Sequence, residues 1–210
     1  MFKKCVLAIV IALALTVPVA RADDVSPAVS FQLTPANVGT DYPLSLGWEF
    51  STNTNVAVSA LGFYVDPQYG LTQGHAVGIY DASGNLLVST TVSSSDPLVG
   101  WFAYHPVATT VLPAGGTYVI AAETGADPLT WNPDGFTVSP NINWISDKWV
   151  YSDSLVFPTE SDYATWGTNG WYGPNFLDPV PTNAVPEPAT MTLFLLGGGL
   201  LSAVRRRKQR

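Results

Sequence analysis

Short runs of β-branched and aromatic residues, separated by turn-forming clusters, are the feature that most constrains the fold of this chain. Between residues 23 and 180, no long segment repeats its apolar residues with the spacing of an amphipathic helix. The runs are bounded by clusters of Gly, Pro, Asn, Asp and Ser, which favour turns. One cluster, Asp81-Ala82-Ser83-Gly84-Asn85, separates two runs as the turn of a β-hairpin does. The pattern therefore predicts a chain of short strands.

These strands define the predicted fold class. We expect an all-β ectodomain over residues 23–177, an antiparallel β-sandwich of jelly-roll-like type, flanked by an N-terminal signal helix and a C-terminal hydrophobic helix. After Glu123 the composition shifts toward Asp, Pro, Asn, Gly and Trp, which predicts long loops together with the closing strands. The expected strands span residues 28–33, 44–50, 56–65, 74–80, 86–92, 99–107, 117–123, 141–150 and 172–177.

The N-terminal segment has the layout of a secretory signal peptide over residues 1–22. A basic start with Lys3 and Lys4 precedes an apolar run over residues 5–15. Ala20 and Ala22 then place small residues at positions −3 and −1 of a cut before Asp23. A membrane-spanning helix is the weaker alternative, because the run is short and ends at a cleavage pattern. We therefore expect the Sec export machinery and signal peptidase as partners.

Charge and cysteine content limit the partners and the chemistry of the mature chain. The single cysteine lies in the signal peptide, so the mature chain has none for a disulfide. Between residues 23 and 185, Lys148 is the one basic residue against fifteen acidic ones, a formal charge of −14. Such a surface repels nucleic acid and anionic lipid, and we expect neither as a partner.

Divalent cations suit an acidic surface, yet no Asp-x-Asp-x-Asp loop occurs in the chain. We assign no metal site and no cofactor. If a structural calcium ion is held, Asp66, Asp127 and Asp134 are the first residues to consider as its ligands.

The C-terminal end has three parts in a fixed order. A Pro-rich linker over residues 178–184 leads to Val185, Pro186, Glu187 and Pro188. Residues 189–204 are uncharged, slightly short of the roughly 20 residues that a membrane-spanning helix needs. A basic cluster follows and would stay on the cytoplasmic side of the membrane. Its members are Arg205, Arg206, Arg207, Lys208 and Arg210.

This arrangement resembles the PEP-CTERM sorting signal of exported bacterial proteins over residues 185–210. The resemblance implies recognition by an exosortase, an integral-membrane transpeptidase, and transient insertion into the inner membrane. Cleavage near Pro-Glu-Pro would then release the protein or transfer it to the surface of a Gram-negative bacterium. Such systems accompany exopolysaccharide production. The alternative is a permanent single-span anchor.

The body of the chain has a resemblance of lower specificity. Segments such as Leu46-Gly47-Trp48-Glu49-Phe50 and Gly74-His75-Ala76-Val77-Gly78 are similar to β-sandwich ectodomains often attached to this signal. The similarity covers residues 44–177. It implies a domain of uncharacterised function, also similar to sandwich modules found near carbohydrate-active proteins, and it carries over no catalytic residue.

Signatures of catalysis are scarce in the mature chain. His75 and His105 each lie in a predicted strand, without a spacing typical of zinc ligands. No Gly-x-Ser-x-Gly elbow is present. Glu49, Glu123 and Glu160 offer carboxylates to a glycosidase, but sequence spacing does not show which of them face each other. We expect a protein that is not an enzyme, with a secreted glycan-active hydrolase as the alternative.

Tryptophans are the best candidates for recognition, because the apolar faces of sugars stack on aromatic rings while their hydroxyls bind Asp and Asn. Trp131, Trp166 and Trp171 lie beside Pro, Gly and Asn and are the predicted glycan-binding residues. Trp48 and Trp101 lie within strand patterns and are predicted to be core residues. The sequence thus favours an exported protein of the exopolysaccharide or biofilm matrix that binds polysaccharide. A structural surface protein with no ligand is the other alternative.

Overall fold

A computed structural model describes residues 25–32, 38–39, 43–162 and 170–179 of the chain. The chain divides into two compact units, and residues 24–180 form the unit that holds all of these residues. Within them, no helix is long and apolar enough to cross a membrane. The predicted signal peptide, hydrophobic segment and basic cluster lie outside the described residues.

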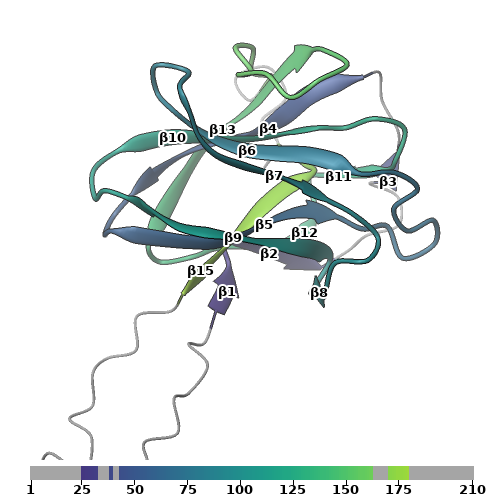
Figure 1. Cartoon of the computed structure of the whole chain (residues 1–210), viewed down its shortest axis with the longest axis horizontal. Coiled ribbons are helices and arrows are strands. Elements are labelled where there is room, and N and C mark those ends of the chain that lie inside the picture. Colours follow the sequence, from purple (N-terminus) through teal and green to yellow (C-terminus); the bar gives the residue numbers. More distant parts are fainter. Residues whose placement is uncertain (1–24, 33–37, 40–42, 163–169, 180–210) are drawn as a thin grey trace, which may run out of the picture. The chain divides into compact units, whose positions relative to one another are not determined.

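Two five-stranded antiparallel sheets form the body of the fold (Figure 1). The first has the order β1 (Val25–Pro27), β15 (Pro174–Pro179), β5 (Val56–Tyr64), β9 (Phe102–Leu112) and β8 (Leu98–Val99). The second has the order β13 (Ile142–Tyr151), β4 (Leu44–Thr52), β10 (Thr117–Glu123), β6 (His75–Asp81) and β7 (Leu86–Val92). The chain passes from one sheet to the other between β4 and β5 and again between β9 and β10, which agrees with a jelly-roll-like sandwich.

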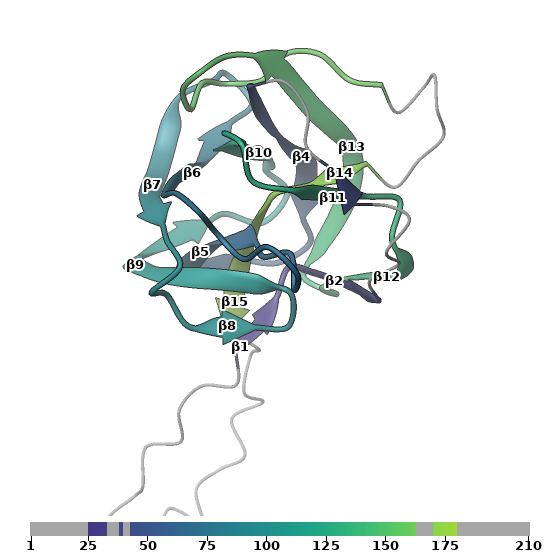
Figure 2. The ribbon, with the colours of Figure 1, turned by 90° about the vertical axis from the view of Figure 1, so that its right-hand side faces the viewer.

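Two smaller sheets complete the fold. One has the order β14 (Trp171–Tyr172), β11 (Leu129–Trp131) and β3 (Val38–Gly39), and the other pairs β12 (Asp134–Val138) with β2 (Val29–Gln32). Figure 2 looks at the side of the molecule that carries β11 and β14.

The core lies between the two large sheets and is rich in aromatic residues. On β4, alternate side chains point inward, and Trp48 and Phe50 are fully buried. Both rings pack against Phe176 of the opposite sheet, at centroid distances of 5.9 and 5.2 Å. Trp48 Nε1 also donates a hydrogen bond to the carbonyl of Pro174 across the core. Burial of each such ring stabilises the fold by roughly 2–3 kcal/mol.

The outer face of β4 is packed too closely for a side chain at Gly47. A Cβ at this position would overlap the backbone carbonyl of Ile120 on the neighbouring strand β10. A glycine is therefore required here for contact between backbones.

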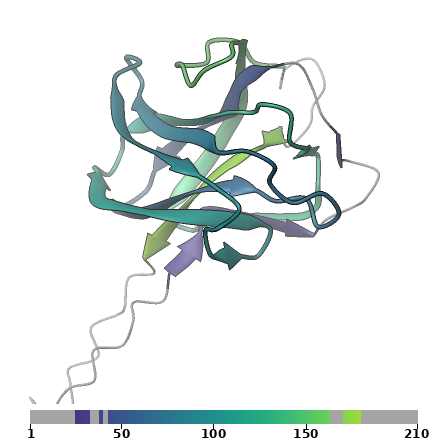
Figure 3. The ribbon, with the colours of Figure 1, turned by 45° about the vertical axis from the view of Figure 1, so that its right-hand side comes forward.

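The prediction of an all-β, antiparallel fold is confirmed, and each of the nine expected strands is present. The last strand has the expected length but is shifted by two residues, because Tyr172 belongs to the separate strand β14 and β15 begins at Pro174. β15 continues through Asp178 and Pro179, because both pair with β1 at Ser26 and Val25. The ectodomain therefore takes up the first two residues of the predicted linker. In Figure 3, the purple β1 and the yellow-green β15 lie next to each other.

Candidate functional site

Strand pairing brings two of the predicted glycan-binding tryptophans together. In the register of β11 with β14, Trp131 lies opposite Trp171, and Thr130 lies opposite Tyr172. Because side chains alternate along a strand, Thr130 and Tyr172 face inward and are fully buried. Trp131 and Trp171 share the other face, are half-buried, and contact each other at a ring-centroid distance of 5.0 Å.

A second aromatic pair lies on the edge strand β13. Trp149 and Tyr151 are two residues apart and pair with Leu46 and Leu44 of β4, so both project from the same face. Their rings meet edge to face with centroids 5.4 Å apart. Tyr151 is 67% exposed, the largest exposed fraction among the large hydrophobic side chains that the structure describes.

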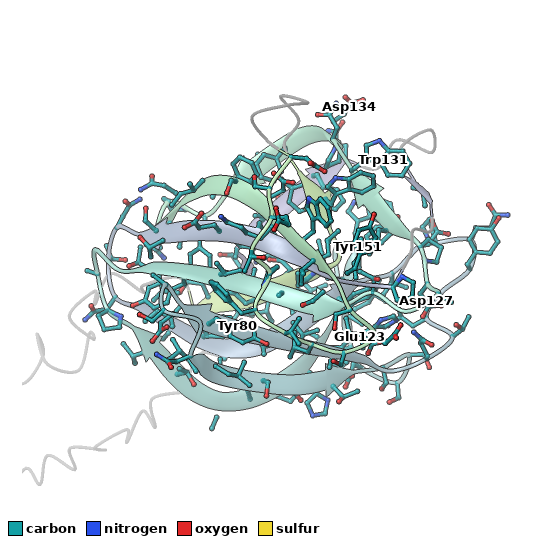
Figure 4. The ribbon with its side chains drawn as sticks, turned by 90° about the horizontal axis from the view of Figure 1, so that it is seen from above. Tyr80, Glu123, Asp127, Trp131, Asp134 and Tyr151 are labelled. Atoms are coloured by element: carbon teal, nitrogen blue, oxygen red, sulfur yellow. The ribbon has the colours of Figure 1, made fainter. Side chains whose placement is uncertain are left out.

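Trp171 of the first pair and both members of the second pair line a cavity. It has a volume of about 90 Å³ and is lined by Leu44, Leu46, Trp149, Tyr151, Asp162 and Trp171. Tyr151 also lines a wider hollow of about 660 Å³, together with Pro43, Ser152 and Asp153. We call Trp131, Trp149, Tyr151 and Trp171 the aromatic site. Figure 4 shows Trp131 and Tyr151 in the same half of the view.

A buried carboxylate holds the segment that brings Asp162 to the cavity. Asp147 of β13 is 1% exposed and accepts hydrogen bonds from the Ser161 hydroxyl and the Asp162 N–H, each 3.0 Å long. Glu160 pairs with Trp149 through two backbone hydrogen bonds, also of 3.0 Å. The nearby negative charge of Asp147 adds to burial in raising the pKa of Tyr172. Residues 160–162 are therefore fixed to the edge of the sheet.

The aromatic site carries negative charge without a basic neighbour. Lys148 is the one Lys or Arg among the residues that the structure describes. It alternates with Trp149 along β13 and so points to the opposite face, where its Nζ lies 3.1 Å from Glu49. Asp153 and Asp162 therefore line the two hollows, and no Lys or Arg of the described residues lies there to neutralise them.

A buried ion pair lies away from the aromatic site, at the start of β6. His75 is fully buried, with Phe63 stacked on its ring at a centroid distance of 3.8 Å. Its Nδ1 lies 3.1 Å from the carbonyl oxygen of Glu123, and its Nε2 lies 2.8 Å from Asp127 Oδ2. Each ring nitrogen therefore lies within hydrogen-bond distance of an oxygen atom that can accept a hydrogen bond.

The partner carboxylate is held by several donors. Asp127 accepts hydrogen bonds from the backbone N–H groups of Thr72 and Gln73 and from the Thr72 hydroxyl. Burial raises the pKa of Asp127, but the hydrogen bonds from Thr72 and His75 outweigh it and hold that pKa below its usual range. The Thr72 hydroxyl binds Asp127 and not His75, so the three residues do not form a nucleophile–base pair. We interpret them as structural.

The other predicted residues have separate surroundings. Trp48 is a core residue as predicted, whereas Trp101 is half-buried and donates a hydrogen bond from Nε1 to the Phe31 carbonyl. Asp66 accepts hydrogen bonds from the N–H groups of Gln68 and Tyr69. Among the described residues, no group of three or more His, Cys, Asp or Glu could hold a metal ion.

Several predicted site residues fall outside the part of the chain that the structure describes. They are Trp166, the signal-cleavage residues Ala20, Ala22 and Asp23, the motif Val185, Pro186, Glu187 and Pro188, and the basic cluster Arg205, Arg206, Arg207, Lys208 and Arg210.

Sequence reasoning missed Trp149, Tyr151 and Asp162. The spacing of two residues between Trp149 and Tyr151 indicates that they share a face of the strand, but not which face of the sheet that is. That assignment depends on the register shift between Trp144 and Ser146, where β13 carries an irregularity.

Comparison with protein-family models defines the class to which the chain belongs. Residues 184–208 match the PEP-CTERM protein-sorting motif, which confirms the predicted resemblance. The chain is thus an exported protein with a β-sandwich ectodomain, and the motif implies processing by an exosortase after passage across the inner membrane of a Gram-negative bacterium. Residues 32–173 match the family described as "Domain of unknown function (DUF4082)", and the chain belongs to this family. Comparisons with curated proteins and with solved structures found no match.

Proposed function

We propose that the exported ectodomain binds polysaccharide of the extracellular matrix through the aromatic site, without acting on it as an enzyme. The observation that carries the proposal is a cavity lined by Trp149, Tyr151 and Trp171, with the ring of Trp131 in contact with that of Trp171.

The physical basis is that a sugar ring has apolar C–H faces and polar edges. The aromatic side chains offer flat surfaces to those faces, and the carboxylates of Asp153 and Asp162 can accept hydrogen bonds from hydroxyl groups at the edges. All four aromatic residues belong to strands, so their positions are fixed before a ligand arrives. Such preorganisation lowers the entropic cost of binding.

The test compares two exposed tyrosines in the protein purified after export. Tyr151 and Tyr69 are 67% and 63% exposed, but only Tyr151 lines the hollows. We expect Tyr151→Ala to weaken binding to matrix polysaccharide about tenfold, the effect of losing roughly 1.4 kcal/mol. Tyr69→Ala should leave binding unchanged. Equal effects of the two substitutions, or no binding to any matrix polysaccharide, would remove the proposal.

Hydrolysis is the second function to test, because Asp162 at the cavity and Asp147 beneath it are neighbouring carboxylates. We expect no release of reducing ends from polysaccharides that the protein binds. If the release of reducing ends persists through purification and vanishes in Asp162→Asn, the protein is a hydrolase and the proposal of binding without catalysis is wrong.

We further propose that processing at both ends delivers the ectodomain to the cell surface or matrix. The intact mass of the exported product should correspond to a start at Asp23 and an end near Pro186 to Pro188. A cell-associated product that still contains Arg205 to Arg210 would instead indicate a permanent anchor.

A further inference from the structure

The charge of the aromatic site narrows the class of polysaccharide that it fits. We propose that the site selects an amino-sugar polymer whose hexosamine units carry free ammonium groups, over neutral and anionic glycans. This inference rests on the proposed binding of polysaccharide.

The first observation is the position of the two carboxylates. Asp162 lines the smaller cavity with Trp149 and Trp171, and Asp153 lines the wider hollow with Tyr151. Since Tyr151 lines both, a linear polymer that crosses this tyrosine meets a carboxylate on each side.

The second observation is that nothing cationic competes for these carboxylates. Lys148 points to the other face of β13 and pairs there with Glu49. His75 is buried against Asp127, and His105 lies beside Asp96. Among the described residues, no other side chain can carry positive charge. A uronic-acid polymer would therefore be repelled, whereas an ammonium group would be attracted.

The third observation is the combination of acid and aromatic ring. An ammonium group over the face of Trp or Tyr is attracted by the negative face of the ring, and a nearby carboxylate adds to that attraction. A hydrogen bond from the Asp162 N–H to Asp147 holds the backbone of Asp162, which lines the same cavity as Trp149 and Trp171. The site thus presents anionic and aromatic groups together.

The experiment measures binding of a glucosamine oligomer and of its N-acetylated counterpart of equal length. It is done at mildly acidic pH, where the amino groups of the glucosamine oligomer are charged. We expect the ammonium form to bind about tenfold more tightly, with a preference that shrinks as salt screens the charges. Asp162→Asn should remove most of the preference and leave binding of the acetylated oligomer within about twofold.

The control separates the site from the acidic surface as a whole. Asp81 is a half-buried aspartate at the end of β6 that lines neither hollow, and Asp81→Asn removes the same charge away from the cavity. If Asp81→Asn lowers the preference as much as Asp162→Asn does, long-range attraction explains it and the inference is wrong.

The remaining outcomes distinguish this inference from the proposed function. Equal binding of both oligomers would overturn the selectivity while leaving polysaccharide binding in place. If neither oligomer binds, both the inferred selectivity and the proposed polysaccharide binding are wrong. Oligolysine is a further probe. If it binds tightly, and Tyr151→Ala weakens its binding as much as it weakens binding of the sugar, the ligand of the site is a cationic peptide instead.

Discussion

The buried ion pair of His75 and Asp127 makes a prediction that can be worked out from its contacts. Asp127→Ala removes the acceptor of the hydrogen bonds from Thr72, Gln73 and His75 Nε2, and leaves Nε2 buried without this partner, while Nδ1 still faces the Glu123 carbonyl. Breaking a buried pair in this way costs about 3–5 kcal/mol. That is a large part of the 5–15 kcal/mol that typically separates folded from unfolded domains.

Asp127→Asn isolates the contribution of charge. The amide carbonyl can still accept hydrogen bonds from the Thr72 N–H and from His75 Nε2, and the Thr72 hydroxyl can rotate to accept one from the amide NH₂. Only the charge is lost, and since charged hydrogen bonds exceed neutral ones by about 1–1.5 kcal/mol, we expect a cost of about 1–2 kcal/mol. Asp153→Ala, at an exposed carboxylate, should stay within about 0.5 kcal/mol of the parent.

The pH dependence has a definite sign. The pKa of Asp127 lies lower in the folded chain than in the unfolded chain, so its contribution to stability is present above the unfolded pKa of about 3.9. It is lost as the pH falls through the folded pKa. The gap between parent and Asp127→Asn should therefore be widest near neutral pH and close in acid.

The assay is urea unfolding followed by tryptophan fluorescence, at neutral pH and at a series of acidic values. The reasoning would be refuted by an Asp127→Ala protein as stable as the parent at neutral pH. A gap between parent and Asp127→Asn that stays constant down to the lowest pH would refute the assigned role of the carboxylate.

Two further predictions concern backbone packing and a buried acid. Gly47→Ala should destabilise the fold by about 3 kcal/mol, because the added methyl group meets the backbone of Ile120. Gly115 lies in a turn with φ of 77° and has open space around it, so Gly115→Ala should cost only about 1–2 kcal/mol. Equal melting temperatures of the two variants would contradict this prediction. Burial raises the pKa of Asp178 despite hydrogen bonds from Asn141 and Ser139. The contribution of Asp178 to the stability of the parent protein should therefore be lost as the pH rises through that pKa. Asp178→Asn should abolish this loss, and chemical unfolding across the acidic pH range measures it.

The sequence was sufficient for the long strands of the large sheets and insufficient for the shortest strands, including β1 and β8 of the first large sheet. β10 has the bounds that its apolar run predicts, because a buried strand of seven residues has a strong signal. β3, β11 and β14 have two or three residues each, which is too short for a period of two to be recognised. Their pairing is set by long-range contacts between segments far apart in the chain.

The aromatic site was also predictable from the sequence only in part. Trp131 and Trp171 could be named from their neighbours in sequence, because Pro, Gly and Asn mark exposed turns. Their contact could not be derived, since 40 positions separate them and only the register of β11 with β14 places them side by side. The burial of His75 could not be predicted from the sequence either, because a histidine in a strand is as compatible with an exposed face as with a buried ion pair.

The position of β15 has a consequence for the order of events during export. β15 lies between β1 and β5, so the first sheet stays divided until the chain has crossed the membrane as far as Pro179. The sorting motif begins at residue 184, only five positions later. Completion of the sandwich and arrival of the sorting signal are thus nearly simultaneous. An exosortase that cuts at this point would act on an ectodomain that has only just acquired the strand it needs to close.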